Sequence, residues 1–409
     1  MKIDFSLPDP ILALIERLEQ NGEEAYLVGG SLRDLLLGIP PHDFDLTTSA
    51  LPEKTVAVFS DHRVIETGLK HGTVTVLVDG EPIEITTFRI DGTYTDARHP
   101  DRVTFTNRIT EDLARRDFTV NAMAYHPTRG LIDPFGGKDD LARKILRAVG
   151  DPKRRFEEDA LRIMRAFRFS AQLDFEIEAE TLTGAKESKF GLTNIARERI
   201  ASEFLRLLTS KNPAHALRSM IDCEILPFVV GSYVPSDTVL NRIAEMPQDE
   251  IARLGFFFSD FSTFSTLAEG SDNRREALSH LLKSLKLSNK QVSGTCAVVS
   301  ASQTAVTTPA DARRLIAACG VYAPLAIRAS VLLGINSPDA IAWIEQNQAP
   351  CTIADLAVTG KDLLALGIEP RRIGTILEKL LRAVLEEPSN NEKNTLLALI
   401  KTWENPKVS

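Results

Sequence analysis

The sequence of 409 residues is poor in cysteine and histidine and has no long apolar run. Its four cysteines lie more than twenty positions apart, so no Cys-x-x-Cys or other zinc spacing occurs. The seven histidines are scattered, which leaves carboxylates as the ligands of any bound metal. No apolar run approaches the roughly 20 residues that a bilayer requires, and the first residues lack the apolar core of a signal peptide. We therefore expect a cytoplasmic protein with reduced cysteines and no membrane partner.

Basic residues are fewer than acidic residues, and they are not evenly distributed along the chain. The chain has 48 Lys and Arg against 56 Asp and Glu, a net charge of −8, which argues against a protein that coats nucleic acid without specificity. Residues 88–168 differ, because 17 Lys and Arg against 13 Asp and Glu give this window a charge of +4. The window could bind a polyanion or be ordinary solvated surface.

Strand signals concentrate in the first 150 residues. Residues 25–28, 44–47 and 73–78 are apolar, alternating or β-branched, and the turn Asp79-Gly80 leads into residues 83–88 as a hairpin. Beyond about residue 151 the chain has helical periodicity, in the segments 158–170, 195–208, 214–221, 274–287 and 362–385. We predict an α+β protein in which a head with a mixed sheet is followed by all-helical domains. Breaks in the pattern place the head at 1–150 and helical domains at 151–210, 211–306 and 307–409.

The first motif is the segment Leu27-Val-Gly-Gly-Ser-Leu-Arg-Asp34. A strand ends at two glycines, Ser31 can cap the helix that follows, and Gly38 can close that helix. A glycine turn at a helix N-terminus presents backbone N–H groups and the positive end of the helix dipole, which suits phosphate. Gly30 and Arg33 are therefore the expected contacts to a triphosphate, although such turns are more often only architectural.

The second motif is a pair of acidic residues, Asp43 and Asp45. Residues two apart in a strand face the same way, so both carboxylates point together while Phe44 and Leu46 point into the core. Carboxylates this close repel unless a divalent cation lies between them, and Mg²⁺ accepts such a site with water and substrate phosphate. We predict that Asp43 and Asp45 bind Mg²⁺ and are catalytic.

A third carboxylate is Glu84, in the segment Pro82-Ile-Glu-Ile-Thr-Thr-Phe88. Ile83 and Ile85 occupy one face of this strand and Glu84 the other, where an adjacent strand could place it beside Asp45. It would then orient or deprotonate an attacking hydroxyl and help to hold a second metal. A solitary acidic residue on a strand is, however, more often plain surface.

Further motifs follow in order along residues 27–168. They are Arg115-Arg-Asp-Phe-Thr-Val-Asn-Ala-Met123, Ile132-Asp-Pro-Phe-Gly-Gly137 and Glu158-Asp-Ala-Leu-Arg-Ile-Met-Arg-Ala-Phe-Arg168. Together with the glycine turn and the aspartate pair, they resemble the class II CCA-adding enzyme and bacterial poly(A) polymerase family. The resemblance implies a polymerase-beta-like nucleotidyltransferase head, a neck that selects the base, a body, and a tail that binds tRNA. Beyond about residue 210 we find no motif of this family, and only the helical character and the length agree with it.

The resemblance also implies roles for single residues. Arg116 would point at the triphosphate, and Arg165 and Arg168 would reach the ribose, the triphosphate or the RNA end, although both could be exposed ion-pairing residues. We expect Asp117 to cap the helix that follows it. The polar loop over residues 91–103 would help to switch the pocket from cytosine to adenine, or be plain surface.

Asp159 and Arg162 can be argued to select the base. They are three apart on a predicted helix and so lie on one face. Cytosine and adenine present an amino donor beside a ring-nitrogen acceptor, which matches a carboxylate next to a guanidinium, whereas guanine and uracil reverse that pair. An unpaired buried polar group costs about 1–3 kcal/mol, so two reversed contacts would reject guanine and uracil.

The leading interpretation is a tRNA nucleotidyltransferase that adds the terminal CCA from CTP and ATP without a template. The RNA 3′-hydroxyl would attack the α-phosphate, pyrophosphate would leave, and Mg²⁺ would stabilise the transferred charge. The expected partners are tRNA, CTP and ATP, and a homodimer is compatible with the sequence. In the tail, Arg371, Arg372, Lys379 and Arg382 could follow an RNA backbone or form a solvated face.

Other interpretations stay open at this point. A bacterial poly(A) polymerase shares the head motifs, although it should carry a more basic C-terminal region, and enzymes that add only CC or only A are further alternatives. A catalytically silent RNA-binding relative would not need the adjoining carboxylates. A small-molecule nucleotidyltransferase would not need a base selector or a long helical remainder.

Overall fold

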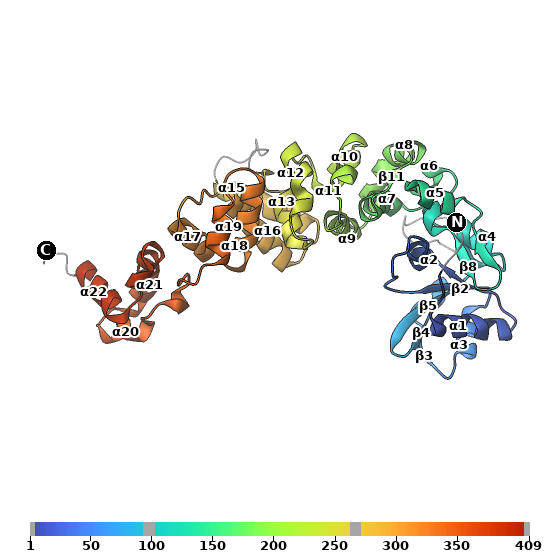
Figure 1. Ribbon diagram of the computed structural model, residues 1–409, viewed down its shortest axis with the longest axis horizontal. Helices are drawn as coiled ribbons and strands as arrows, with labels where there is room; N and C mark the ends of the chain where they lie inside the picture. Colours follow the sequence, from blue (N-terminus) through green and yellow to red (C-terminus); the bar gives the residue numbers. More distant parts are fainter. Residues whose placement is uncertain (1–4, 93–102, 262–270, 405–409) are drawn as a thin grey trace. The chain divides into compact units, whose positions relative to one another are not determined.

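The computed structural model describes residues 5–92, 103–261 and 271–404. The chain divides into two compact units, Met1–Gly231 and Ser232–Ser409 (Figure 1). The polar loop that we expect to switch the pocket lies, except for its ends, outside the described residues, so its role stays a prediction.

The first unit is built on a seven-stranded sheet with the order β3-β4-β5-β2-β1-β8-β9. Its strands are β1 (Ala25–Val28), β2 (Asp45–Thr48), β3 (Arg63–Ile65), β4 (Thr73–Val78), β5 (Glu81–Thr87), β8 (Ala124–His126) and β9 (Gly130–Ile132). Strand β2 runs parallel to β5, whereas the other neighbours are antiparallel. This confirms the predicted mixed sheet.

The predicted hairpin is confirmed almost to the residue. Strands β4 and β5 pair antiparallel from Val78–Glu81 to Thr73–Thr86. Asp79 and Gly80 both adopt positive φ, 52° and 88°, as a two-residue hairpin turn requires. In β5, Ile83 and Ile85 are buried on one face of the strand, and Glu84 lies on the opposite, polar face.

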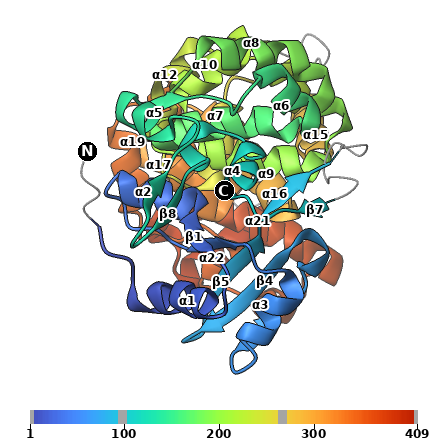
Figure 2. The ribbon, with the colours of Figure 1, turned by 90° about the vertical axis from the view of Figure 1, so that its right-hand side faces the viewer.

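Two short sheets and a set of helices complete the first unit. The short sheets pair β6 (Arg89–Asp91) with β7 (Val103–Phe105) and β10 (Ile145–Leu146) with β11 (Glu176–Ile177). The helices before residue 151 are α1 (Asp9–Gln20), α2 (Gly29–Leu36), α3 (Pro52–Val58), α4 (Ile109–Ala114) and α5 (Gly137–Arg143). Figure 2 shows α1 and α3 beside each other along the sheet, where α1 contacts β1 and α3 contacts β4 and β5. On α4, Ile109 and Leu113 pack with Tyr26 and Val28 of β1, which anchors the strand that leads into the glycine turn.

From residue 151 to the end of the first unit the chain is helical except for β11. The helices are α6 (Pro152–Glu158), α7 (Leu161–Leu173), α8 (Ala179–Ser188), α9 (Arg197–Leu208), α10 (Ala214–Asp222) and α11 (Leu226–Val230). The helices expected at 195–208 and 214–221 are confirmed as α9 and α10. The helix expected over 158–170 is wrong in its start, because α6 ends at Glu158 and α7 begins only at Leu161.

The second unit is all-helical in its described residues. Its α-helices are α12 (Asp237–Arg242), α13 (Glu250–Phe257), α15 (Ser271–Ser284), α16 (Asn289–Ser302), α17 (Pro309–Cys319), α18 (Ala323–Leu332), α19 (Asp339–Glu345), α20 (Gly360–Ala365), α21 (Pro370–Glu386) and α22 (Lys393–Glu404). The single helix expected over 362–385 is wrong. Gly367, with φ of 82°, ends the first segment, and Pro370 begins the next, so the chain turns between α20 and α21.

One stretch of the second unit contradicts our expectation about apolar runs. Residues Pro309–Leu332 are long enough to span a membrane and contain an 18-residue window with a mean hydropathy of 1.8. They form two α-helices, α17 and α18, joined by a 3₁₀ turn at Gly320–Tyr322. Leu315, Ala326 and Ile327 from these helices belong to one buried cluster with α19. The apolar character therefore builds a helical core.

Candidate active site

A cavity of about 610 Å³ lies in the first unit, where the N-terminus of α2, the start of β2 and the start of α7 meet. Of the ten predicted site residues, those that line it are Gly30, Arg33, Asp43, Asp45, Arg116, Asp159, Arg162 and Arg165. Glu84 and Arg168 are not among the lining residues. The aspartate pair and the expected base-selecting couple thus face one cavity.

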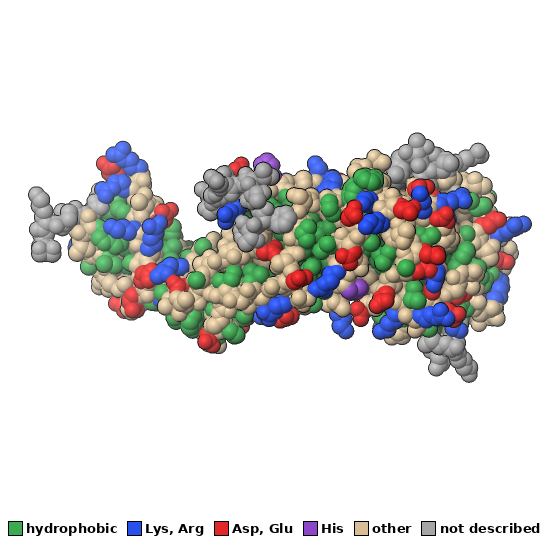
Figure 3. All heavy atoms as spheres, turned by 90° about the horizontal axis from the view of Figure 1, so that it is seen from above, with side chains coloured by type: hydrophobic (Ala, Val, Ile, Leu, Met, Phe, Trp, Pro, Cys, Tyr) green, Lys and Arg blue, Asp and Glu red, His purple; other side chains and the backbone are tan. Residues whose placement is uncertain are grey.

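Arginine dominates the wall of this cavity. Seven arginines and four aspartates line it, and five of these arginines come from residues 88–168. Several of the arginines that make residues 88–168 net positive therefore lie together at the cavity. Their charge suits a polyphosphate. By contrast, Figure 3 shows acidic and basic side chains mixed over the face in view.

The glycine turn explains how the chain approaches the acidic residues so closely. Gly29 has φ of 76°, and a Cβ there would lie 3.3 Å from Asp45 Oδ2 and 3.4 Å from Arg116 Nη1. A side chain would be strained and would crowd both charged groups. Gly29 therefore leaves room beside the Asp45 carboxylate.

The predicted cap at Ser31 is wrong. Helix α2 begins at Gly29, so Ser31 lies inside it, and its hydroxyl donates to the Val28 carbonyl oxygen at 2.9 Å. In the described chain no side chain caps this helix, which leaves its first N–H groups for an anion. Gly38 follows the helix with φ of 73°, as predicted for its C-terminal end.

Asp45 is the first residue of β2, and Asp43 lies two residues before the strand begins. Our expectation that both belong to one strand is therefore wrong, yet both reach the cavity. Burial raises the pKa of Asp45 to about 6, the charges of Asp43 and Glu84 add to this rise, and Arg116 opposes it. The cluster is thus short of positive charge where an ion or a cationic group would be favoured.

Glu84 lies directly beside Asp45, as we expected. The two residues are register partners in the parallel pair of β2 and β5. Glu84 is exposed and outside the lining of the cavity, and its charge helps to raise the pKa of Asp45. The structure therefore places Glu84 next to Asp45, and the expected catalytic role of Glu84 stays a prediction.

Arg33 and Arg165 are joined through two polar residues of the segment 115–123, Asn121 and Asp117. Arg33 Nη1 donates to Asn121 Oδ1 at 2.9 Å, and Asn121 Nδ2 donates to Asp117 Oδ1 at 3.2 Å. Arg165 Nε donates to Asp117 Oδ2 at 2.8 Å. The expected capping role of Asp117 is wrong, because the 3₁₀ turn that follows (Thr119–Asn121) has no side-chain cap and Asp117 instead pairs with Arg165.

Arg116 is half-buried among opposite and like charges. Its Nη2 lies 3.5 Å from Asp112 Oδ2, its Nη1 donates to the Asn121 carbonyl oxygen at 3.5 Å, and its buried Nε has no partner among the described residues. Burial lowers the pKa of the guanidinium, while Asp112 and Asp45 counteract this effect. A guanidinium with such long contacts is suited to receive an incoming anion.

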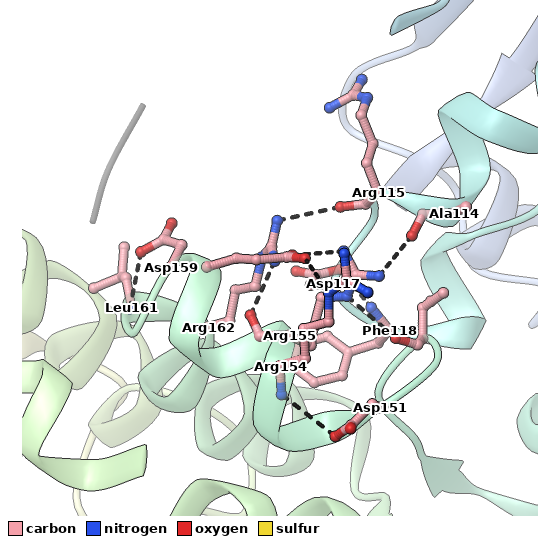
Figure 4. Close-up of polar contacts among 12 residues, drawn as sticks. Ala114, Arg115, Asp117, Phe118, Asp151, Arg154, Arg155, Asp159, Leu161 and Arg162 are labelled. Carbon is pink, nitrogen blue, oxygen red and sulfur yellow. Dashed lines mark hydrogen bonds and ion pairs between the residues drawn. The ribbon is translucent and has the colours of Figure 1, made fainter. Parts of the chain in front are cut away.

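The structure changes our view of Asp159 and Arg162 (Figure 4). Asp159 lies between α6 and α7, where its Oδ1 accepts a hydrogen bond from Leu161 N at 2.9 Å, so the two residues do not share a helix face. The arginine nearest to the Asp159 carboxylate is Arg199 of α9, with Nη2 at 3.4 Å from Oδ2. Arg162 donates to the carbonyl oxygens of Arg155 and Arg115 at 2.9 and 3.2 Å and to Glu158.

Arg168 does not take the position that we expected. It is buried and pairs with Glu203 of α9, outside the cavity lining. Its guanidinium lies over the Phe169 ring, and those of Arg33 and Arg165 lie 5.3 and 5.2 Å from the centre of that ring. Arg168 therefore supports the cavity wall from behind.

Sequence reasoning missed several residues of the cavity. They are His71, Arg89, Arg115, Asp117, Asn121, Leu161, Phe169 and Arg199. Three of them, Arg115, Asp117 and Asn121, belong to the segment 115–123, in which we expected only Arg116 to contact the substrate. Arg199 is some forty residues from its partner, and no spacing in the sequence points to it.

Three family profiles match the chain. They are the Poly A polymerase head domain at residues 25–147, the "Probable RNA and SrmB-binding site of polymerase A" at 174–232, and tRNA nucleotidyltransferase domain 2 at 264–400. The CCA-adding enzyme of Pediococcus pentosaceus is 37% identical over 392 residues, which cover 94% of this chain and 95% of the relative. The chain belongs to the CCA-adding enzyme family. It is thus a tRNA nucleotidyltransferase, as predicted.

Other CCA-adding enzymes agree in sequence and fold. That of Leuconostoc citreum is 37% identical over 408 residues, covering 97% of this chain and 96% of the relative. The Bacillus stearothermophilus CCA-adding enzyme in complex with CTP has a TM-score of 0.79 at 31% identity, covering 98% of this chain and all of that one. The Thermotoga maritima CCA-adding enzyme complexed with tRNA, at 21% identity and a TM-score of 0.67 over 97% of this chain and 96% of that one, shares the fold. These matches confirm the predicted fold class.

Proposed function

We propose that this CCA-adding enzyme adds cytidine, cytidine and adenosine to the 3′ end of tRNA from CTP and ATP, with no nucleic-acid template. The observation that carries the proposal is that one cavity is lined both by Asp43 and Asp45 and by Asp159 and Arg162. A phosphoryl-transfer centre and a polar couple able to choose a base thus share one substrate site. The relative of known structure at 31% identity holds CTP.

Binding of the triphosphate falls to the glycine turn and the arginines. The uncapped N-terminus of α2 at Gly29 and Gly30 offers N–H groups to phosphate oxygens. Arg33 and Arg116 add charge-assisted hydrogen bonds, and Asp117 holds Arg165 at the same wall. The RNA 3′-hydroxyl attacks the α-phosphate, its proton leaves to a base or water, and pyrophosphate departs.

The acidic residues fit Mg²⁺. Gly29 leaves space beside Asp45, and burial with the charges of Asp43 and Glu84 raises the pKa of Asp45 to about 6, so a cation would relieve the repulsion. The described residues include no set of three donors that could hold a metal alone, which suits an ion that takes two carboxylates and substrate phosphate. When bound, Mg²⁺ would offset phosphate charge and lower the pKa of the attacking hydroxyl.

Glu84 is proposed as the third carboxylate of the reaction. Its position beside Asp45 in the parallel strand pair supports a role in orienting the 3′-hydroxyl or in holding a second ion. Its exposure outside the cavity lining means that the RNA end would have to meet it from the open side.

Base selection is assigned to Asp159 and Arg162. Asp159 would accept from the amino group of cytosine or adenine, and Arg162 would donate to the adjacent ring nitrogen. Their anchoring by Leu161 N and by the carbonyl oxygens of Arg155 and Arg115 supports a fixed template. The helical second unit is proposed to bind tRNA. The division into four domains and a homodimer stay predictions.

The test is extension of a tRNA that ends before the CCA, with each labelled nucleotide supplied singly and together. We expect two additions from CTP alone and one further addition when ATP is present. A long adenosine tail would assign the chain to poly(A) polymerase activity, and no extension would overturn the proposal. An Asp43→Ala variant serves as the inactive control and Glu81→Ala, an exposed acidic residue at the start of β5, as the matched control.

A further inference from the structure

Arg155 of α6 joins two segments of the first unit that lie far apart in the sequence. Its Nη2 donates to the carbonyl oxygen of Ala114 at 2.8 Å, at the end of α4, and its Nε donates to that of Val149 at 3.1 Å. Its Nη1 donates to Glu158 Oε2 at 2.8 Å. The planar guanidinium can serve these three acceptors at once, which a lysine ammonium on a flexible stem does not reproduce.

Glu158 connects Arg155 to Arg162. The same Oε2 atom accepts from Arg162 Nη1 at 2.6 Å. Arg162 in turn donates to the carbonyl oxygen of Arg155 at 2.9 Å and to that of Arg115 at 3.2 Å. The contacts form a closed ring through the backbone of residues 114–115, Arg155, Glu158 and Arg162.

The ring links the two ends of the substrate site. Residues 114–115 lead directly into Arg116, which lines the cavity where the triphosphate is proposed to bind. Arg162 lines it where the base is proposed to bind. Arg155 does not line the cavity, so it can affect the substrate only through these neighbours.

We propose that Arg155 is a positioning residue for nucleotide selection, which holds Arg162 at a set place relative to Arg116. The inference rests on the proposed function of Asp159 and Arg162. A template made of side chains discriminates only if its donors cannot turn to suit a wrong base. Removing the guanidinium of Arg155 leaves Glu158 with one of the two arginines that hydrogen-bond to its Oε2 and lets the Arg162 guanidinium adjust to uracil.

Arg154 offers a matched control one position earlier on the same helix. Its side chain is 83% exposed, and its Nε lies 3.8 Å from the other oxygen of Glu158, at the limit of an ion pair. It has the same charge and length as Arg155 but, among the described residues, does not donate to the carbonyl oxygens of Ala114 and Val149 as Arg155 does. Replacing either arginine with an uncharged residue therefore removes one positive charge near Glu158, but only the change at Arg155 also removes the bonds to residues 114 and 149.

The experiment compares wild-type enzyme with Arg155→Met, Arg155→Lys and Arg154→Met. Steady-state kcat/KM is measured for CTP and for UTP on tRNA that ends before the CCA, and Tm is measured for each variant. We expect the ratio for CTP over UTP to fall roughly tenfold in Arg155→Met, the effect of losing a charged hydrogen bond, and less in Arg155→Lys. Arg154→Met should keep the ratio within about twofold.

Simple loss of stability lowers both rates together and leaves the ratio unchanged. A ratio within about twofold of wild type in the Arg155 variants overturns the inference. If Arg155→Met does not fold, the ratio of Arg155→Lys decides in the same way. If wild-type enzyme extends the tRNA with neither nucleotide, the proposed function fails instead, so the two failures are distinguishable.

Discussion

Replacing Asp117 with asparagine tests whether this carboxylate is the electrostatic partner of Arg165. Asp117 is 8% exposed and accepts hydrogen bonds from Arg165, from Asn121 and from its neighbour Phe118 N at 2.8 Å. An amide of the same shape can keep the bond to Phe118 N. It removes the negative charge that faces the Arg165 guanidinium.

The pKa of Asp117 sets the expected magnitude. Burial acts to raise this pKa, but the charge and hydrogen bonds of Arg165, with help from Asn121, lower it from 3.8 to about 2. That difference corresponds to about 2 kcal/mol of stabilisation at neutral pH. We therefore expect Asp117→Asn to lower the free energy of unfolding by about 2 kcal/mol at pH 7.

The effect has a defined pH window. Because the folded pKa lies below the unfolded one, the stabilisation is fully present above about pH 4 and is lost as the pH falls through 2. The difference between wild type and variant should shrink to about 1 kcal/mol at pH 3. A cause unrelated to this carboxylate would not follow that course.

The positions of the tryptophans provide an internal control. Both tryptophans, Trp343 and Trp403, belong to the second unit. Urea unfolding followed by far-UV circular dichroism, together with hydrogen exchange of peptides from β1 and β8, reports on the first unit. Tryptophan fluorescence reports on the second, whose transition should not move.

Two results would refute this reasoning. One is equal stability of wild type and Asp117→Asn at pH 7. The other is a difference that is as large at pH 3 as at pH 7.

Three further changes have defined outcomes. Asp43→Ala should lower the rate of extension by roughly 10²- to 10³-fold while tRNA binding in a filter assay is kept, and loss of binding would contradict its role as a metal ligand. Arg162→Ala should raise misincorporation of UMP relative to CMP, and unchanged fidelity by product sequencing would exclude it as a selector. Gly137→Ala should lower stability by about 3 kcal/mol in urea unfolding, because a Cβ there would lie 2.2 Å from the Thr119 carbonyl oxygen. If Gly137→Ala is as stable as wild type, the backbone around Thr119 moves to make room for the methyl group, and this prediction is wrong.

Local patterns predicted the sheet of the head well. Two-residue alternation and the turn Asp79-Gly80 specify β4 and β5, since each strand buries one face and the turn accepts positive φ at both positions. The face of β5 that carries Glu84, opposite to that of Ile83 and Ile85, followed from the same alternation. Strand patterns succeed here because the decisive interactions lie within a few residues.

Helix boundaries were less predictable where polar side chains compete with the backbone. Asp159 accepts a hydrogen bond from Leu161 N, which stops α6 and starts α7, although periodicity runs through the break. Gly367 and Pro370 were overlooked inside another periodic segment that the structure divides. At residues 159–160 and at residues 366–369 the apolar periodicity of the sequence continues, although the helix is interrupted.

Long-range ion pairs lie beyond the reach of spacing arguments. Arg168 bonds to Glu203 and Asp159 lies near Arg199, and each partner stands on α9, more than thirty residues away. Arg165 and Arg168, for which we expected similar positions, therefore differ: Arg165 lines the cavity and Arg168 is buried outside its lining. The packing of α7 against α9 brings these pairs together, and it cannot be read from residue spacing.

The parallel register of β2 and β5 restricts how this chain tolerates changes of length. Asp45 stands opposite Glu84 only as long as no residue is gained or lost within either strand. A single insertion ahead of Glu84 in β5 would exchange the two faces of the strand, burying a glutamate and turning an isoleucine to solvent. Engineered tags or loop grafts in the head are best placed at the Asp79-Gly80 turn, where the ladder ends.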